Sequence, residues 1–263
     1  GEAGPRGGVL GMVTFRVSAL TALLGSAMMG SVFVGSLHLW KLIGYRDTNR
    51  DEAGTIQRRF VSVLFACVFS AAVIAGLAQQ QADSDSLLEL LGLRCAEPGR
   101  AIISSLALTA VLFLGPIVQH LVDVSEDAAY LVSLPGPKWV TLRNHVLAPV
   151  AEEFVFRACL VRLWVGAGFP PGAIIVFSPF CFALAHVHHF LELIRRQDRK
   201  TALLQVIFQV FYTSLFGMYS TLLLMRTGST AAVILAHSFC NHQGFPDLSF
   251  LENEHHPLWR HRA

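Results

Sequence analysis

The sequence predicts an all-α membrane protein, a polytopic bundle of about seven transmembrane helices in a single membrane domain over residues 1–263. Of the 263 residues, 53% are hydrophobic and only 14% are charged, whereas soluble domains carry about 25% charged residues. The mean hydropathy is +0.52, and apolar runs of about 20 residues, long enough to cross a bilayer, recur along the chain. The net charge of +2, without a dense basic run, excludes a nucleic-acid-binding protein.

Seven apolar runs are the expected spans, and the connections between them are polar. They are residues 17–43, 60–78, 101–122, 146–165, 172–190, 203–225 and 229–243, the last of which is short for a span. Residues 87–93 are too few to span and too apolar for open water, which predicts an interfacial or re-entrant segment. The five scattered cysteines predict small apolar side chains rather than a disulfide framework.

Basic residues predict the orientation of the bundle. They are concentrated in the loops after the first and fifth spans, which carry Lys41, Arg46, Arg50, Arg58 and Arg59, and Arg195, Arg196, Arg199 and Lys200. The intervening loops hold few basic residues. The positive-inside rule therefore puts the first, third and fifth loops in the cytosol and the N-terminus across the membrane.

Two adjacent carboxylates and an arginine, Glu152, Glu153 and Arg157, lie inside the fourth apolar run. A charge at mid-bilayer costs at least about 2.5–3.5 kcal/mol, so such residues usually face an interior cavity and serve a function. Glu153 and Arg157 are four residues apart and share a helix face, where they can neutralise each other. Glu152 is rotated by roughly 100° and escapes that pair. An ion pair that only locks helix packing is the alternative, but it leaves Glu152 without a role.

Two later runs bring further polar side chains to the depth of Glu152. His186 lies near the end of the fifth run, and His237 and Asn241 lie in the second half of the seventh. His237 and Asn241 are four residues apart and point the same way from one helix. Under the predicted topology all of them lie near the cytosolic face. Each has an ordinary alternative explanation, because a lone His near a helix end is commonly interfacial and Asn is a common helix C-cap. Their shared depth favours one active-site cavity.

These residue types predict hydrolysis of an amide by an activated water. Glu152 and His186 could deprotonate the water and hand the proton to the leaving amine, while His237 and Asn241 offer N–H donors to the tetrahedral oxyanion. A zinc site is the main alternative, because Glu with two His is a known catalytic set. No HExxH motif occurs and Asn is a poor zinc ligand, so we expect no metal and no other cofactor. A nucleophilic Cys159 is a weaker alternative, because no nearby residue would activate its thiol.

Three motifs, in this order, resemble the type II CAAX prenyl protease family, within the wider group of CAAX proteases and bacteriocin-processing enzymes. The family pattern is EExxxR, FxxxH and HxxxN, which stands here at 152–157, 182–186 and 237–241. The resemblance extends to residues 143–149, 185–189, 226–228 and 244–246, and more weakly to 35–37 and 112–116. EExxxR alone is weakly specific, whereas the three motifs with these flanks indicate the eukaryotic branch.

The resemblance implies a multi-pass endopeptidase of the endoplasmic-reticulum membrane. Its implied substrates are farnesylated or geranylgeranylated CAAX proteins, such as small GTPases, from which it removes the C-terminal aaX tripeptide. A lipid-tailed substrate should enter sideways from the bilayer and reach a polar cavity near the cytosolic face. The implied roles are water activation by Glu152 and His186, oxyanion stabilisation by His237 and Asn241, and support of the site by Glu153 and Arg157.

The chain departs from the family pattern after the third motif. The family continues into a further span, whereas residues 247–263 form a polar tail too charged to span, so we expect the catalytic core over about 143–246. A catalytically inert membrane scaffold of the same fold is therefore an alternative function. A transporter or channel is another, because intramembrane charges are typical of that class, but the sequence shows no inverted repeat.

Overall fold

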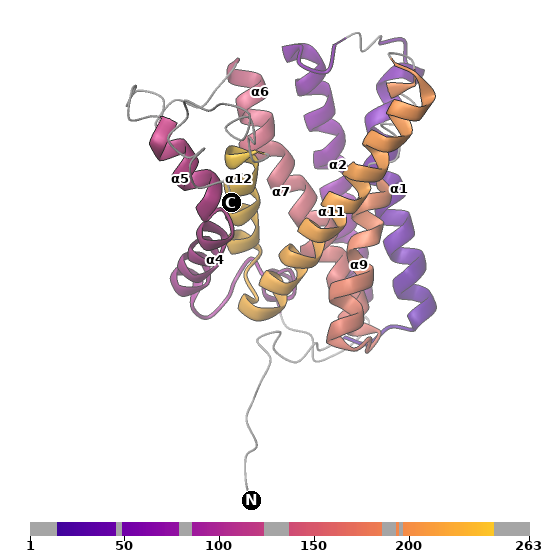
Figure 1. Cartoon of the computed structure of the whole chain (residues 1–263). Coiled ribbons are helices and arrows are strands. Elements are labelled where there is room, and N and C mark those ends of the chain that lie inside the picture. Colours follow the sequence, from indigo (N-terminus) through magenta and orange to yellow (C-terminus); the bar gives the residue numbers. More distant parts are fainter. Residues whose placement is uncertain are drawn as a thin grey trace, which may run out of the picture.

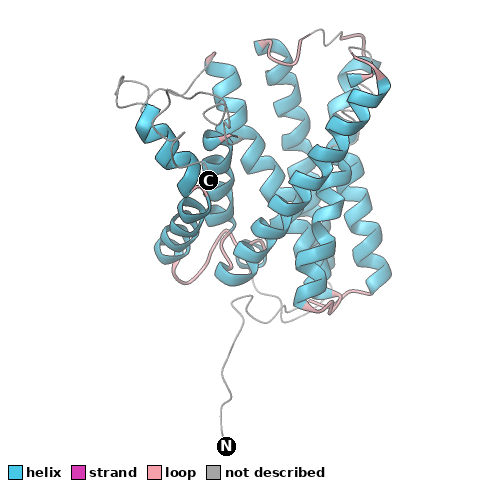
Figure 2. Ribbon diagram, viewed as in Figure 1, coloured by secondary structure: helices cyan, strands magenta, loops and turns pink. Residues whose placement is uncertain are grey.

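In the computed structural model the chain is built from helices. The structure describes residues 15–45, 49–78, 86–123, 137–185, 193–194 and 197–244, and over these ranges every regular element is a helix (Figure 2). The all-α prediction is therefore confirmed for this part of the chain. His186 and the polar tail at 247–263 lie outside the described residues.

The long helices run up and down between two ends of a bundle (Figure 1). In chain order the elements are α1 (Ala19–Leu42), α2 (Ala53–Ala78), α3 (Leu87–Leu90), α4 (Pro98–Leu112), α5 (Leu114–Asp123), α6 (Lys138–Leu142), the π-helical η3 (Arg143–Leu147), α7 (Ala148–Glu153), the π-helical η4 (Phe154–Cys159), α8 (Leu160–Gly166), α9 (Pro171–Ala185), α11 (Arg199–Thr227) and α12 (Thr230–Gln243). We call the end at which α2, α6 and α11 begin the upper end, and the end at which α4 and α12 begin the lower end.

Polar caps fix where the long helices begin and end. The Ser18 hydroxyl and the Asp198 carboxylate accept hydrogen bonds from first-turn N–H groups of α1 and α11. At the lower end, α11 ends at Gly228, which adopts the left-handed conformation with φ 65°. Ser229 follows directly, and its hydroxyl caps α12. Helices α11 and α12 are therefore joined by a tight turn.

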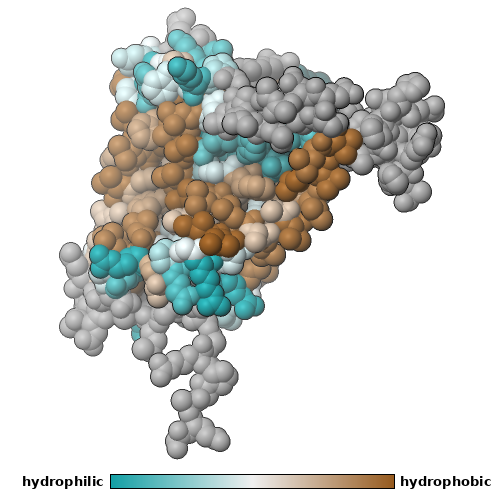
Figure 3. Space-filling view, turned by 90° about the vertical axis from the view of Figure 1, so that its left-hand side faces the viewer, coloured by the Kyte–Doolittle hydropathy of each residue, from teal (hydrophilic) through white to brown (hydrophobic). Residues whose placement is uncertain are grey.

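The helix faces that pack together carry small residues, while large apolar side chains face outward. Two buried faces carry three small residues four positions apart: Ser62, Ala66 and Ser70 in α2, and Ala101, Ser105 and Thr109 in α4. Small residues at this spacing let helices approach closely in a bilayer. Outward-facing Ile103 and Val111 are 71% and 69% exposed. Such side chains form a hydrophobic band between two hydrophilic ends (Figure 3), as a protein embedded in lipid requires.

Membrane-spanning helices are present at several of the predicted positions. Among the described residues, α1, α2 and α11 are long and apolar enough to cross a bilayer, and the bent pair of α4 and α5 makes a fourth. The apolar α9 has 15 described residues, or about 22 Å of helix, less than the roughly 30 Å hydrocarbon core. Helices also occupy the predicted runs at 146–165 and 229–243. A multi-pass membrane protein is thus established, and seven crossings stay a proposal.

The predicted span at 101–122 is bent. The axes of α4 and α5 differ by 69° at the break between them. Pro116 explains the bend, because it has no N–H to offer the carbonyl of Leu112 and its ring clashes with that carbonyl. The residues at 87–93, for which the sequence predicts an interfacial segment, form the single turn of α3 and the bend after it, with Leu87 and Leu88 exposed and Leu90 buried.

Candidate active site

The two adjacent carboxylates lie where the geometry of their helix changes. Residues 138–166 form one uninterrupted helical run, which contains the π-helical segments η3 and η4 on either side of α7. Glu152 and Glu153 are the last two residues of α7, directly before η4. Short π-helical segments within α-helices occur frequently at functional sites. This run is therefore the first part of the candidate site.

Pro149 and η3 leave two carbonyl groups of this run without their usual helical donors. Pro149 has no N–H, so the carbonyl of His145, four residues before it, loses its normal partner. In an α-helix the N–H of Ala148 would donate to the carbonyl of Asn144, four residues before it. Here it donates to the carbonyl of Arg143, five residues before it, so the carbonyl of Asn144 is left without its usual donor. A carbonyl group away from water needs another donor.

Side chains of α12 donate to both of these carbonyl groups. The Ser238 hydroxyl donates to the carbonyl oxygen of His145 at 2.6 Å, and the Asn241 amide donates to that of Asn144 at 2.8 Å. These bonds fix the last turns of α12 against η3. They also bring His237, on the same helix, to the two carboxylates. The Asn241 amide has a second hydrogen, so one donor remains beyond this bond.

Glu153 is the centre of a buried charged cluster. One carboxylate oxygen lies 3.2 Å from Nε of Arg157, and the other lies 2.6 Å from Nδ1 of His237. The side chains of Glu153 and Arg157 are 0% and 1% exposed, and charges so deeply buried are stable only when paired. Because the carboxylate accepts the bond, the hydrogen lies on Nδ1 of His237. The ring is thereby held in one orientation, with Nε2 on the side of Glu152.

Two phenylalanine rings pack against the charged cluster. Cζ of Arg157 lies 4.3 Å from the ring centroid of Phe182 and 5.6 Å from that of Phe216. The terminal nitrogens of Arg157 are buried without a hydrogen-bond partner in the described part of the chain, so the ring faces supply the electrostatic contact. The ring of Phe216 also lies 4.5 Å from that of His237. The cluster is therefore enclosed by apolar side chains of α9 and α11.

Glu152 lies beside this cluster and faces open space. Its Oε2 is 4.0 Å from Nε2 of His237, and its side chain is 20% exposed. It lines a cavity of about 180 Å³, whereas Glu153 does not. One carboxylate is thus held in ion pairs, and the other is accessible to a ligand.

The cavity beside Glu152 combines apolar walls with basic groups. Its apolar walls include Phe33, Leu37, Phe60, Val63 and Phe156. Arg50, Arg59 and Arg143 line it as well. Ligand sites commonly pair an apolar lining with a few polar groups that fix orientation. This arrangement suits an amphiphilic ligand that carries a negative group beside its apolar part.

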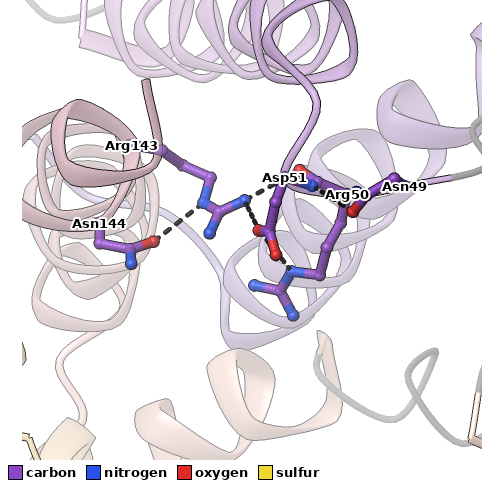
Figure 4. A network of polar contacts seen from close by, with 5 residues as sticks. All are labelled: Asn49, Arg50, Asp51, Arg143 and Asn144. Carbon is purple, nitrogen blue, oxygen red and sulfur yellow. Dashed lines mark hydrogen bonds and ion pairs between the residues drawn. The ribbon is translucent and has the colours of Figure 1, made fainter. Parts of the chain in front are cut away.

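Arg143 is held in the cavity wall by a polar network (Figure 4). Its Nη1 donates to Oδ1 of Asp51 at 2.8 Å and to the carbonyl oxygen of Arg50 at 2.9 Å, and its Nε donates to Oδ1 of Asn144 at 2.9 Å. The hydrogen bond from Arg143 holds the pKa of the Asp51 carboxyl below its usual value. Asp51 is therefore ionised at neutral pH, and the pair ties the turn before α2 to η3.

The structure brings most of the predicted site residues together. Glu152, Glu153, Arg157 and His237 are neighbours, and Asn241 lies one turn beyond His237 with its amide on Asn144. The distance between Glu152 and His186 stays a prediction, because His186 lies outside the described residues. Within the described ranges, no three metal-ligating side chains are arranged to hold an ion.

Two further sequence expectations concern cysteines. All five are free thiols, so the expectation of no disulfide framework is met. Cys159 is fully buried in the apolar core between α1, α2 and η4. A substrate could not reach its sulfur without opening that core, which leaves the cysteine alternative without support.

Sequence reasoning did not assign Arg143, Ser238 and Phe216 to the site. Pro149 was a usable signal for Ser238, because a proline inside a helix frees a carbonyl that a neighbouring helix must bind. Arg143 and Phe216 carried no such signal. Their place depends on how α2, η3 and α11 pack, which no local pattern encodes.

Comparison with known proteins identifies the family. Residues 134–242 match the family described as type II CAAX prenyl endopeptidase, Rce1-like. The chain is 33% identical to human CAAX prenyl protease 2 over 262 residues, covering 93% of this chain and 77% of that protein. It is 32% identical to CAAX prenyl protease 2 of Caenorhabditis elegans over 243 residues, covering 91% and 88%. No solved structure matches the chain. The chain therefore belongs to the Rce1-like family of type II CAAX prenyl endopeptidases.

Proposed function

We propose that this chain is a glutamate-dependent intramembrane endopeptidase that removes the C-terminal aaX tripeptide from prenylated CAAX proteins. Farnesylated or geranylgeranylated small GTPases are the substrates we expect, and the endoplasmic-reticulum membrane is the location. The observation that carries the proposal is the accessible Glu152 carboxylate, which lines a cavity with one oxygen 4.0 Å from Nε2 of His237. Family membership supports the reaction class.

Glu152 is the proposed general base. A water held between Glu152 and His186 loses a proton to the carboxylate, and the resulting hydroxide attacks the carbonyl carbon of the prenylated cysteine. When the C–N bond breaks, the same proton passes to the leaving amine. Positioned acid–base groups of this kind contribute about 10²–10⁴ to a rate.

His237 and Asn241 are the proposed donors to the oxyanion. This role needs a hydrogen on Nε2 of His237 while Nδ1 donates to Glu153, so the ring acts as an imidazolium. Two carboxylates, Glu153 at 2.6 Å and Glu152 at 4.0 Å, balance that positive charge. Asn241 contributes the amide hydrogen that its bond to Asn144 leaves over. Glu153 and Arg157 support the site by holding His237 in place.

The cavity lining supports recognition of a prenylated peptide with a free C-terminus. Such a substrate ends in a carboxylate, and Arg50, Arg59 and Arg143 line the same cavity as Glu152. Arginine binds a carboxylate through two parallel hydrogen bonds. The apolar walls, among them Phe33 and Phe60, suit the aliphatic residues of the tripeptide.

The proposed topology has seven crossings in one membrane domain, with the catalytic core over about 143–246. Glu152 is halfway along the helical run 138–166, and its cavity extends toward the upper end, where the basic residues Arg50, Arg59, Arg199 and Lys200 are located. By the positive-inside rule this end faces the cytosol, where prenylated proteins are available. The lipid tail then remains in the bilayer while the peptide reaches Glu152.

The test is tripeptide release from a synthetic farnesylated CAAX peptide by the purified chain in nanodiscs, followed by mass spectrometry. We expect cleavage after the farnesylated cysteine and little cleavage of the unprenylated peptide. No cleavage by the folded wild-type chain would favour the inert scaffold. Loss of activity with a zinc chelator, restored by zinc, would favour the zinc-dependent protease, whereas chelator-resistant activity supports water activation by Glu152 and His186.

A further inference from the structure

A second, larger cavity lies at the lower end of the bundle, away from Glu152. Its volume is about 860 Å³, within the range of small-molecule sites, and it is lined by residues that the proposed reaction does not use. Arg162, in its wall, is nine residues after Glu153 on one helical run, or about 13 Å along the axis. The two cavities therefore occupy different ends of the same bundle.

The lining of this lower cavity is strongly basic. Four arginines, Arg94, Arg100, Arg162 and Arg226, and two acids, Glu89 and Glu97, contribute to it. One of the acids, Glu97, is already paired with Arg100 at 3.1 Å. Arg162 is only 5% exposed, and its guanidinium remains charged at any physiological pH. The cavity therefore presents a net positive charge, part of it shielded from bulk water.

The wall of the cavity is a defined structure. The Thr230 hydroxyl donates to the carbonyl of Leu91 at 2.6 Å, and the Thr230 N–H donates to that of Gly92 at 2.9 Å. Gly92 has φ 63°, and a Cβ there would lie 2.6 Å from the carbonyl oxygen of Gly228. The bend after α3 is thereby fixed to the turn between α11 and α12. Arg94 and Arg226, one on each side of this junction, both line the cavity.

The surroundings of the cavity combine this charge with lipid-facing surface. Leu87, Leu88 and Leu93 flank the basic residues and are 36%, 46% and 48% exposed. Leu90 and Ala101 contribute apolar surface to the lining itself. At this end of the molecule the hydrophobic band gives way to hydrophilic side chains (Figure 3). A ligand there would meet basic groups beside an apolar surface. This combination suits a phospholipid, whose charged headgroup adjoins its apolar acyl chains.

We propose that the lower cavity binds the phosphate group of an anionic phospholipid headgroup. The guanidinium group of arginine can bind two phosphate oxygens through parallel hydrogen bonds. The exposed leucines of 87–93 can pack against the acyl chains. The site is separate from the proposed active site and does not depend on the proposed function. Bound lipid would hold the segment at 87–94 to the turn before α12, the helix that carries His237.

Lipid-dependent thermal unfolding of the full, delipidated chain in non-ionic detergent tests this site. The probes are phosphatidylglycerol, phosphatidylcholine and inorganic phosphate, each added alone. We expect phosphatidylglycerol to raise the unfolding temperature more than phosphatidylcholine does. In Arg94→Gln/Arg226→Gln, native mass spectrometry should show phosphatidylglycerol binding weakened roughly tenfold for each arginine. Both arginines are exposed in the structure, so these substitutions should leave the fold intact.

The matched control is Arg199→Gln/Lys200→Gln, which removes two positive charges from the upper end. This control should keep the wild-type response to phosphatidylglycerol. An equal response to inorganic phosphate would support the anion site and assign it to a soluble phosphate compound. Equal phosphatidylglycerol binding by wild type and Arg94→Gln/Arg226→Gln, or no preference over phosphatidylcholine in the wild type, would overturn the proposal. The single variants, measured separately, keep the test valid should the double variant not fold.

Discussion

The Nδ1 atom of His237 lies 2.6 Å from a carboxylate oxygen of Glu153, and this contact joins α12 to the helical run that carries both carboxylates of the candidate site. Glu153 ends α7 and His237 lies on α12, 84 residues later. Because the second carboxylate oxygen is paired with Arg157, Glu153 cannot turn away from the ring. The contact therefore sets which ring nitrogen of His237 faces Glu152.

Replacement of Glu153 by glutamine should damage both stability and activity. Removing one partner of a buried ion pair commonly costs about 3–5 kcal/mol, because the other charge is left unpaired. Here the buried guanidinium of Arg157 would be left unpaired, and His237 would lose the carboxylate that orients its ring. Glu153→Gln should lower both the unfolding temperature and the rate of peptide cleavage. The control is Glu52→Gln, which replaces an exposed acid by its amide and should change neither. Full stability in Glu153→Gln would show that the pair is not formed in the protein.

Gly217 should not tolerate even one added methyl group. A Cβ at this position of α11 would lie 2.6 Å from Cβ of Pro179 and 3.2 Å from Nη2 of Arg157. Overpacking of this kind costs about 1–3 kcal/mol. Gly217→Ala should therefore lower the unfolding temperature and reduce cleavage by shifting Arg157. Gly76→Ala in α2, where the added Cβ meets nothing within 4 Å, should not lower it; equal effects of the two changes would contradict the packing described.

The Asp51–Arg143 pair should add a small, pH-dependent stability. The folded-state pKa of Asp51 is depressed, so its contribution is present above the unfolded value of about 3.9 and is lost as pH falls through the folded value. The pair is partly exposed, which limits its contribution to about 1 kcal/mol or less. The stability difference between wild type and Asp51→Asn should be constant from pH 8 to pH 5 and shrink below about pH 4. A difference that grows on acidification would be the wrong sign.

Arg59 should matter for the free C-terminus of the substrate. If it binds the terminal carboxylate, Arg59→Gln should lower kcat/KM by about 10–100-fold for a peptide with a free C-terminus. The same peptide with an amidated C-terminus should be cleaved equally by wild type and variant. The neighbouring Arg58 does not line the cavity, so Arg58→Gln is the matched control. An identical loss with both peptides would assign Arg59 a structural role instead.

Local patterns in the sequence predicted much of the fold and part of the site. Apolar runs located the helices, since burial in lipid requires about 20 apolar residues wherever a helix crosses. The spacing of Glu153 and Arg157 predicted a pair on one helix face, and the structure forms it at 3.2 Å. Such predictions succeed because they depend on residues one helical turn apart.

Features that depend on packing between distant segments were not predictable in this way. The bond from Ser238 to the carbonyl of His145 joins residues 93 positions apart. The cavity beside Glu152 is formed by α1, α2, η3, α7 and η4 together. The two π-helical segments were not predictable either, because each is a short bulge inside a longer α-helical run.

The most direct test of the proposed mechanism is cleavage of a farnesylated CAAX peptide by Glu152→Gln, compared with wild type and with Glu52→Gln at equal folded concentration. The amide cannot accept the proton of the water, so kcat should fall by about 10²–10⁴. Glutamine has nearly the same size as glutamate, so the unfolding temperature should change little. Near-wild-type cleavage by Glu152→Gln would contradict the assignment of Glu152 as the base.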